Sequence, residues 1–535
     1  MDNAETSQES ADPRAIQVTS MNSCLSTSIR EVWSDVLRFR WVLIGLMLLE
    51  FIARAQSITA PMYSIDGYFA NPDRTGETPI ILANGRWGLV AMLWLRGQLG
   101  YEGMDVVPSA LILSVVLLTG AGFLYARVLL KTFDAAELGI FVALFTLHPF
   151  NTELYTFSDA TLDNTLPVFL VGCGLTVAGT TVRSWLGVAT GGFLMLIALS
   201  IYQLAIAHAV IVSMLAIAER TIKLFRNQPA RGRLRQVLAM APTRGLAVAM
   251  AAATLSLIAS MIIVDAFHIA FADGRARLPD LSLIPDLAAK AAGLAGALRM
   301  VFMPPAGIVP PAASIILIGI LVFSAISLLL TILRRSGVGI AFVSGGLLAA
   351  AAISSAIIPL AANFIWLVPR VLSPFSILVA GLATLGWRCV RLSWVRHTFA
   401  AALIVLLLSY VGSSNRILYD QRRVNLWDVQ QANRILRRFE DDPKFRNMGA
   451  LALVHGNSRN SALLPTTFGD MNISAFATKT AKLALMEQAT GMRFAAPSKA
   501  ESQVAETYCA SADVWPAAGS VVIVGSLGIV CLPRP

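Results

Sequence analysis

The chain has 535 residues, of which 56% are hydrophobic and only 14% are charged, and its mean hydropathy is +0.67. Soluble globular proteins carry roughly 25% charged residues, so this composition excludes an ordinary soluble domain. Apolar runs of about 20 residues, the length that crosses a bilayer as a helix, recur along the chain. The sequence therefore predicts a polytopic α-helical membrane protein.

The formal net charge of +10 does not indicate a nucleic-acid partner, because the basic residues occupy short links between apolar runs. They concentrate between residues 220 and 235, at 334–335 and between 388 and 396. This distribution is typical of cytoplasmic loops under the positive-inside rule. The sequence also lacks a Walker A loop, an HExxH motif and a dinucleotide fingerprint, which disfavours a nucleotide-driven pump.

Residues 1–36 are polar and rich in Ser, Asp and Glu, and they predict a disordered tail. They lack the basic start and the small-residue cleavage site of a signal peptide, so the first apolar run is expected to be a retained helix. Arg38 and Arg40 directly before that run place the tail in the cytoplasm.

Eleven membrane spans are predicted, and together they form a transmembrane domain over residues 37–412. Their expected ranges are 41–60, 107–128, 137–152, 165–182, 185–202, 204–219, a run ending near Asp265, 312–333, 338–359, 374–390 and 397–412. An odd number of spans places the C-terminus outside the cytoplasm. The expected outer segments are 60–106, the acidic loop Pro149–Asp163, and 266–311 with an interfacial helix at Asp286–Phe302.

Residues 413–535 predict a small extracytoplasmic α/β domain that rests on the membrane. The segment DVQQANRILRRFEDD indicates an amphipathic helix, and ALALVHG and SVVIVGSLGIVCL indicate short strands. The apolar face of that helix is expected to hold Val429, Ala432, Ile435, Leu436 and Phe439. Cys509 and Cys531 both fall in this domain, and a disulfide between them fits an oxidising compartment.

Asp66 is the first candidate catalytic residue, because it follows the first apolar run by a few residues. Partial desolvation at the membrane border raises the pKa of a carboxyl toward a value that suits a general base. The alternative reading is an ordinary interfacial aspartate that caps a turn.

Arg86 and Arg370 are candidate phosphate ligands, since a guanidinium fits a phosphate with two hydrogen bonds. Arg86 lies in the run Asn-Gly-Arg-Trp, and Arg370 lies between two prolines in WLVPRVLSP, a poor context for a plain helix. The alternative for Arg86 is a side chain that snorkels beside an interfacial tryptophan, Trp87. Trp87 is also a candidate contact for the substrate.

The second outer loop supplies Glu153, Asp159 and Asp163, which could position a sugar hydroxyl. Tyr202 and Gln203 end the fifth span near the same face and form the rest of the candidate substrate site. The alternatives are a solvated acidic loop and an interfacial tyrosine. Whether a divalent metal such as Mg²⁺ or Mn²⁺ is used stays open, and Asp66, Glu153 and Asp159 are the residues that could hold one.

Several short motifs resemble those of the GtrII-type glucosyltransferases, polytopic enzymes that decorate bacterial O-antigen. The most specific are Ser64-Ile65-Asp66-Gly67-Tyr68 after the first span and Gly85-Arg86-Trp87. Supporting pieces are the acidic loop after Pro149, Ser200-Ile201-Tyr202-Gln203, the run Arg370 to Pro374, and the helix motif Asp428, Ala432, Ile435. One departure is that Gly67 follows Asp66 where such enzymes often carry a second acid.

The resemblance implies a GT-C-like fold in the bacterial inner membrane and an inverting transfer of a hexose, with glucose the first expectation. The implied donor is a sugar on a polyprenyl phosphate, made on the inner face by a separate transferase and flipped outward by a flippase. The implied acceptor is a surface glycan such as O-antigen lipopolysaccharide. Asp66 would act as the base, and Arg86 and Arg370 would hold the donor phosphate.

Three other readings remain. A transporter or flippase of a lipid-linked sugar explains the spans and arginines, although no internal repeat supports it. A transferase that moves another sugar to protein or lipid A fits the same residues. A purely structural envelope protein leaves the polar outer segments unexplained.

Overall fold

The computed structural model describes residues 29–60, 62–69, 78–100, 107–158, 160–180, 185–224, 236–237, 239–269, 283–356, 367–456, 464–469, 471–478 and 481–534. Its helices of the first half are α2 (Arg40–Thr59), α3 (Thr78–Ala83), α4 (Trp87–Gln98), α5 (Val107–Leu130), α6 (Ala135–Thr146), α7 (Pro149–Thr156), α8 (Thr161–Thr180), α9 (Trp185–Ile201), α10 (Ala205–Leu224) and α12 (Ala241–Ala266). The second half adds α13 (Leu283–Phe302), α14 (Pro311–Ser336), α15 (Val338–Ser354), α17 (Phe375–Cys389), α18 (Ser393–Glu440), α19 (Ala481–Thr490) and α20 (Lys499–Ser511).

Seven of the described helices are long and apolar enough to cross a membrane, judged by length and composition: α2, α5, α8, α10, α12, α14 and α18. Four shorter apolar helices, α6, α9, α15 and α17, accompany them. Each span expected from the sequence overlaps one of these helices. The structure therefore supports a multi-pass helical membrane protein, while the count of eleven spans remains a prediction.

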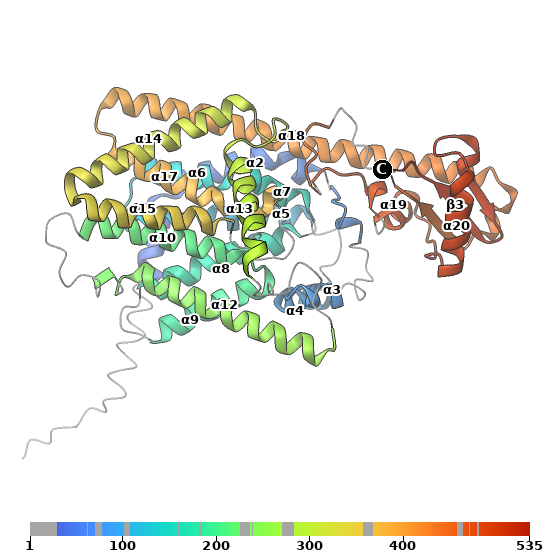
Figure 1. The fold of residues 1–535 in the computed structure, drawn as a ribbon, viewed down its shortest axis with the longest axis horizontal. Helices are drawn as coiled ribbons and strands as arrows, with labels where there is room; N and C mark the ends of the chain where they lie inside the picture. The colour runs from blue at the N-terminus through green and yellow to red at the C-terminus, as the bar shows by residue number, and fades with distance from the viewer. Residues whose placement is uncertain are drawn as a thin grey trace, which may run out of the picture.

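The long helices pack side by side into a bundle around one apolar core, and the C-terminal region extends from one end of it (Figure 1). Buried aromatic side chains from α5, α6, α7, α17 and α18 fill the core, among them Tyr125, Phe145, Phe150, Phe375 and Tyr410. Helix α13, expected as an interfacial helix, runs across the direction of α12 and α14 (Figure 1). Helices α3 and α4 lie at the end of the bundle nearest the C-terminal region.

The first structured residues lie earlier than expected. Residues 29–38 are helical, so the prediction of a disordered tail to residue 36 is wrong for residues 29–36, and residues 1–28 lie outside the described part. Two acidic side chains of this segment, Glu31 and Asp35, form ion pairs with Arg127 at the end of α5. These long-range pairs hold the segment against the bundle, and a local composition argument does not anticipate them.

The third predicted span, 137–152, is broken in the structure. Helix α6 ends at Thr146, and α7 begins at Pro149, where the missing N–H of proline costs nothing at the first helical position. His148 precedes this proline with an extended ψ of 130°, and its Nδ1 accepts a hydrogen bond from the Phe150 N–H. Asn151 donates to the Phe145 carbonyl and stabilises the end of α6.

Helix α7 corrects the expectation of an acidic outer loop after Pro149. All eight of its residues, Pro149–Thr156, are buried, and the helix packs against α18, α8 and α2. Non-helical backbone at membrane depth is tolerated only where it is enclosed by protein or lines a cavity. The break at Leu147–His148 meets this condition, because both residues are buried.

Helix α18 has 48 residues and is continuous from the last span into the C-terminal region, so residue 413 lies inside it. At 1.5 Å per residue it is about 72 Å long, more than twice the roughly 30 Å hydrocarbon core of a bilayer. The amphipathic helix expected in the tail is its last part. Of the expected apolar face, Ala432, Ile435, Leu436 and Phe439 are buried, whereas Val429 is 37% exposed.

The C-terminal region contains a three-stranded sheet of order β1-β3-β2, formed by β1 (Ala450–Val454), β2 (Val521–Val524) and β3 (Leu527–Cys531). Strand β1 pairs with β3 in parallel, and β2 and β3 form an antiparallel hairpin. Both runs expected as strands are therefore strands in the structure. A second apolar core forms between this sheet, α19 and the last turns of α18.

Candidate functional site

The Asn-Gly-Arg-Trp run forms a turn between α3 and α4, and two other elements hold it. Gly85 adopts φ +72°, which glycine reaches without steric cost. Gln203 Nε2 donates to the Asn84 carbonyl over 2.8 Å, and Ser260 Oγ donates to the Gly85 carbonyl over 3.1 Å. The ends of α9 and α12 thus fix the turn that carries Arg86.

Two side chains that the sequence placed in the site meet at this turn. The guanidinium carbon of Arg86 lies 5.3 Å from the ring centroid of Tyr202, a cation–π contact. A Cβ at Gly88 would overlap Ser200, so α4 lies directly on α9. Trp87 is half-buried at the start of α4, and its buried Nε1 has no hydrogen-bond partner within the described part of the chain. The structure therefore brings Arg86, Trp87, Tyr202 and Gln203 together.

Glu153 and Arg370 form an ion pair that the sequence did not predict. Arg370 Nη1 lies 2.6 Å from Glu153 Oε1, and the Arg370 backbone N–H donates to Glu153 Oε2. The Glu153 side chain is 0% exposed and that of Arg370 is 18% exposed. Glu153 is therefore a buried partner of an arginine, and the alternative of a solvated acidic loop is wrong for it.

Arg370 sits in a short 3-10 turn, η4 (Pro369–Leu372), as its proline-flanked context suggested. Its guanidinium carbon lies 4.4 Å from the ring centroid of Phe157, directly after α7. The ion pair and this cation–π contact join η4 to α7 from two directions. An arginine matches a buried carboxylate well because its planar fork offers several N–H donors.

A second buried charged network lies on α2 and was missed as a site. Glu50 and Arg54 are both 0% exposed. Glu50 accepts hydrogen bonds from the Tyr155 hydroxyl (2.8 Å) and from Thr119 Oγ1 (3.0 Å). Arg54 donates to the Thr146 carbonyl over 3.0 Å and stacks on the Tyr155 ring. The sequence signal for this network is a pair of opposite charges, Glu50 and Arg54, four residues apart within an apolar run. Ionisable groups in membrane helices are rare and often functional.

Asp163, in the first turn of α8, also forms an ion pair with an arginine. Its Oδ1 lies 3.1 Å from Nη1 of Arg96 on α4, and only 7% of its side chain is exposed. Asp159 lies outside the described residues. Among the described residues no group of three His, Cys, Asp or Glu side chains is placed to hold a metal ion.

Asp66 lies in a turn between α2 and η1 (Gly67–Phe69), and its side chain is exposed. The Gly67 N–H bonds both the carbonyl and the hydroxyl of Ser64, which shapes the turn. The protein therefore does not bury the Asp66 carboxyl, which the sequence analysis named as the candidate general base.

The segment around Asp66 is anchored on both sides by α18. The Tyr63 N–H donates to Asn425 Oδ1, and the Tyr63 carbonyl accepts from Gln421 and Asn425. Tyr68 stacks on Tyr63 with ring centroids 5.2 Å apart and is buried in the core of the C-terminal region. The turn that carries the exposed carboxyl is therefore anchored to α18.

The C-terminal region contains the disulfide Cys509–Cys531, which ties α20 to β3 with Cα atoms 5.3 Å apart. Among the other described cysteines, Cys173 and Cys389 are not disulfide-bonded.

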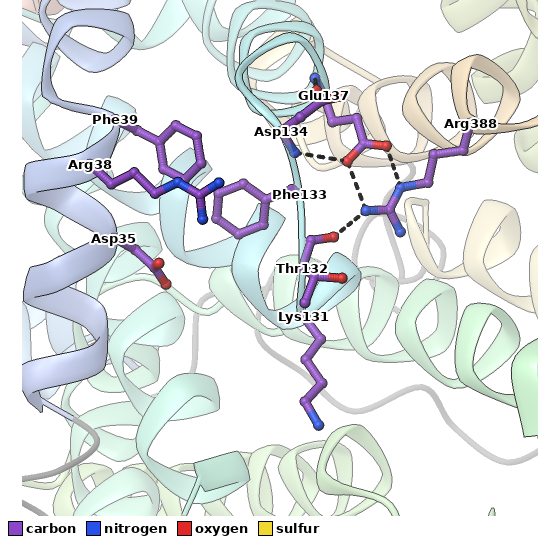
Figure 2. Close-up of a pocket in the computed structure, with 9 residues that line it drawn as sticks. All are labelled: Asp35, Arg38, Phe39, Lys131, Thr132, Phe133, Asp134, Glu137 and Arg388. Carbon is purple, nitrogen blue, oxygen red and sulfur yellow. Dashed lines mark hydrogen bonds and ion pairs between the residues drawn. The ribbon is translucent and has the colours of Figure 1, made fainter.

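The opposite end of the bundle holds a cleft of about 390 Å³ (Figure 2). Arg388 lines this cleft and donates hydrogen bonds to Glu137 from Nε (2.7 Å) and Nη2 (2.8 Å). It also donates to the Thr132 carbonyl and to Glu219. The helical segment before α2 forms the facing wall with Asp35, Arg38 and Phe39 (Figure 2). Arg38 and Arg388 belong to segments that the sequence assigned to the cytoplasm.

Comparison with protein-family models, with curated protein sequences and with solved structures finds no match to this chain.

Proposed function

We propose that the chain is an integral-membrane glycosyltransferase that moves a hexose from a polyprenyl-phosphate donor to a surface glycan, at the bundle end nearest the C-terminal region. Asp66 is the general base, and Arg86 is the main contact for the donor phosphate. The inner membrane of a bacterium, a cytoplasmic N-terminus and a periplasmic C-terminal region belong to this proposal. So do a donor-forming transferase and a flippase as partners.

The observation that carries the proposal is the contrast among the candidate acids. The Glu153 and Asp163 side chains are buried, 0% and 7% exposed, whereas Asp66 is exposed on an anchored turn. A general base must come within hydrogen-bond reach of the acceptor hydroxyl, which an exposed carboxyl can do. A fixed support also suits catalysis, because a misplaced base loses most of its effect.

The donor phosphate is assigned to Arg86 more than to Arg370. Arg370 pairs with the fully buried Glu153, which ties its guanidinium to the inside of the protein. Arg86 lies against the ring of Tyr202 and next to Trp87, and a guanidinium binds a phosphate through two charge-assisted hydrogen bonds. Gln203 positions the Arg86 turn through its bond to Asn84, which makes Gln203 a positioning residue.

The proposed reaction is a single displacement. The acceptor hydroxyl oxygen attacks the anomeric carbon, and Asp66 takes the hydroxyl proton as the new glycosidic bond forms. The bond between the anomeric carbon and the phosphate oxygen breaks, and polyprenyl phosphate leaves with its charge stabilised by Arg86. The sugar is inverted at the anomeric carbon, and no protein nucleophile takes part.

The test compares Asp66→Asn with Asp265→Asn in proteoliposomes that contain a synthetic polyprenyl-phosphate hexose and a glycan acceptor. Asp265 is the matched control, because it is also an exposed carboxylate at the end of an apolar helix, α12. General-base catalysis contributes about 10²- to 10⁴-fold, so Asp66→Asn is expected to lose that much activity. Asp265→Asn should stay within about twofold of wild type, since no proton transfer depends on it.

Equal transfer by wild type and Asp66→Asn would remove Asp66 from the reaction. A transporter of a lipid-linked sugar is the second candidate function. The buried Glu50 and Arg54 in α2 favour it, because charged groups inside membrane helices often mark transport pathways.

A further inference from the structure

The C-terminal region sends a turn back into the membrane bundle. We call residues 464–469 and 471–474 the docking turn. Thr466 Oγ1 donates to Asp420 Oδ2 over 2.8 Å, and Asn472 Nδ2 donates to the Ile417 carbonyl over 2.9 Å. Asn472 also donates to Thr466 over 2.6 Å. These bonds attach the docking turn to α18 where the helix leaves the bundle.

Part of the docking turn is packed like an interior element, whereas Pro465 and Gly469 are exposed. Thr466 is 0% exposed, and Met471 and Asn472 are each 1% exposed. Met471 belongs to the apolar core of the bundle, and it exchanges backbone hydrogen bonds with Phe468 over 3.0 and 3.2 Å. Connecting segments usually run over the surface of a protein, so this burial is unusual and indicates a structural task.

The tip of the docking turn touches η4. Gly469 has φ +61°, and a Cβ there would lie 2.5 Å from Val368 Cγ1, closer than real Cβ atoms approach a neighbour. Val368 is 3% exposed and is the residue directly before η4. On the other side, a Cβ at Gly307 would overlap the Pro465 carbonyl. The docking turn is therefore wedged between η4 and the connection from α13 to α14.

Val368 in turn determines where Arg370 lies. The Val368 carbonyl accepts hydrogen bonds from the Val371 N–H (3.1 Å) and the Leu372 N–H (3.3 Å), which close η4. Within this turn the Arg370 N–H donates to Glu153. A displacement of Val368 would move the backbone of Arg370 and lengthen its bonds to Glu153.

We propose that the docking turn is a positioning element that holds η4 in place, so that the C-terminal region is an integral part of the candidate site. The contact runs from Gly469 through Val368 to the Arg370–Glu153 pair. Its effect on sugar transfer rests on the proposed function, but its effect on η4 does not.

The experiment uses two glycines with nearly equal positive φ in the full-length protein. Gly525, in the turn between β2 and β3, has φ +62°, and a Cβ there would meet nothing within 4 Å. Gly469→Ala and Gly525→Ala therefore both place a side chain at a positive φ, and only Gly469→Ala presses on Val368. Hydrogen–deuterium exchange of the peptide that contains Arg370 reports whether η4 has loosened.

We expect Gly469→Ala to raise the exchange rate of that peptide by about tenfold or more and Gly525→Ala to leave it unchanged. The double variant Gly469→Ala/Val368→Ala should restore slow exchange. It removes Val368 Cγ1 and leaves the Val368 Cβ 3.6 Å from the new Cβ, an ordinary contact. In the transfer assay, kcat should fall in Gly469→Ala and recover in the double variant.

Unchanged exchange in Gly469→Ala would overturn the proposal. An equal rise in Gly525→Ala would do the same, because it would trace the effect to backbone strain alone, and so would failure of Val368→Ala to restore protection. If the wild type transfers no sugar while the exchange results hold, the proposed function fails and the positioning role of the docking turn stands.

Discussion

The two ends of the membrane bundle place their charged residues in different ways. At the end shown in Figure 2, the pairs keep partial contact with solvent: Arg388 is 20% exposed, and its partners Glu137 and Glu219 are 12% and 7% exposed. Toward the C-terminal region Glu153 is 0% exposed, and Glu50 and Arg54 within α2 are also 0% exposed. The charged side chains of the first group keep partial contact with solvent, whereas Glu50, Arg54 and Glu153 have none.

The difference matters because the two arrangements have different energetic costs. Surface pairs contribute about 0–1 kcal/mol and are screened by salt. A buried pair carries a desolvation penalty of several kcal/mol per ion, so burial of charges is weak evidence for stability and points toward a functional task. The candidate site residues Arg86, Tyr202, Glu153 and Arg370 gather at the end where the penalty is larger.

The largest effect is expected at the Glu153–Arg370 pair. Arg370→Met should lower the free energy of unfolding by about 3–5 kcal/mol, because it leaves a fully buried carboxylate without its guanidinium. The double variant Glu153→Gln/Arg370→Met should recover most of that loss, since no charge is then left unpaired. Denaturation in detergent micelles measures both. A double variant that is as unstable as Arg370→Met would show that packing, and not charge, holds η4 to α7.

A smaller, pH-dependent effect is expected at Asp428, in the part of α18 that extends beyond its apolar first half. Burial raises the pKa of Asp428 to about 7, although Ser474 and the Ala475 N–H donate to the carboxyl. The folded state therefore prefers the protonated acid, and its stability should fall as the pH rises from about 4 to about 7.

Asp428→Asn resembles the protonated acid in shape and should remove this dependence. We expect the melting temperature of the variant minus that of the wild type to increase between about pH 5 and about pH 8. Parallel curves for the two proteins would mean that Asp428 does not titrate in this window.

The smallest effect is expected at the opposite end. Arg388→Met should cost on the order of 1 kcal/mol at physiological ionic strength, less than Arg370→Met, because the Arg388 and Glu137 side chains keep partial contact with solvent. The cost should shrink further in about 1 M NaCl, where the Debye length is about 3 Å, whereas the cost of Arg370→Met should persist. Equal salt dependence at the two ends would break the comparison.

The sequence predicts the helices well, because a hydrophobic run is a local signal. The eleven predicted spans overlap apolar helices, and the strand runs at residues 450 and 521 form a sheet. It also predicts that Arg370 avoids a regular helix, since Pro369 and Pro374 restrict the backbone around it. The break at His148 was missed because the predicted span was continued through Pro149 to residue 152.

The sequence could not predict which groups pair with the charged residues, because these contacts join residues that are far apart along the chain. Glu153 meets Arg370 across 217 residues, and Thr466 meets Asp420 across 46. The acidic composition after Pro149 suggested a solvated loop, and only the packing of α7 inside the bundle shows that Glu153 is enclosed. The docking turn has no local signature beyond Gly469 and Asn472, which both adopt positive φ.

The central claim is that a lipid-linked sugar is transferred and not merely moved across the bilayer. The most direct measurement follows a labelled polyprenyl-phosphate hexose in proteoliposomes that contain the wild-type protein and a glycan acceptor. We expect the label to appear in a glycosidic bond to the acceptor, with polyprenyl phosphate released in equal amount. Passage of intact donor across the bilayer with no glycosidic product would contradict the claim and establish a transporter.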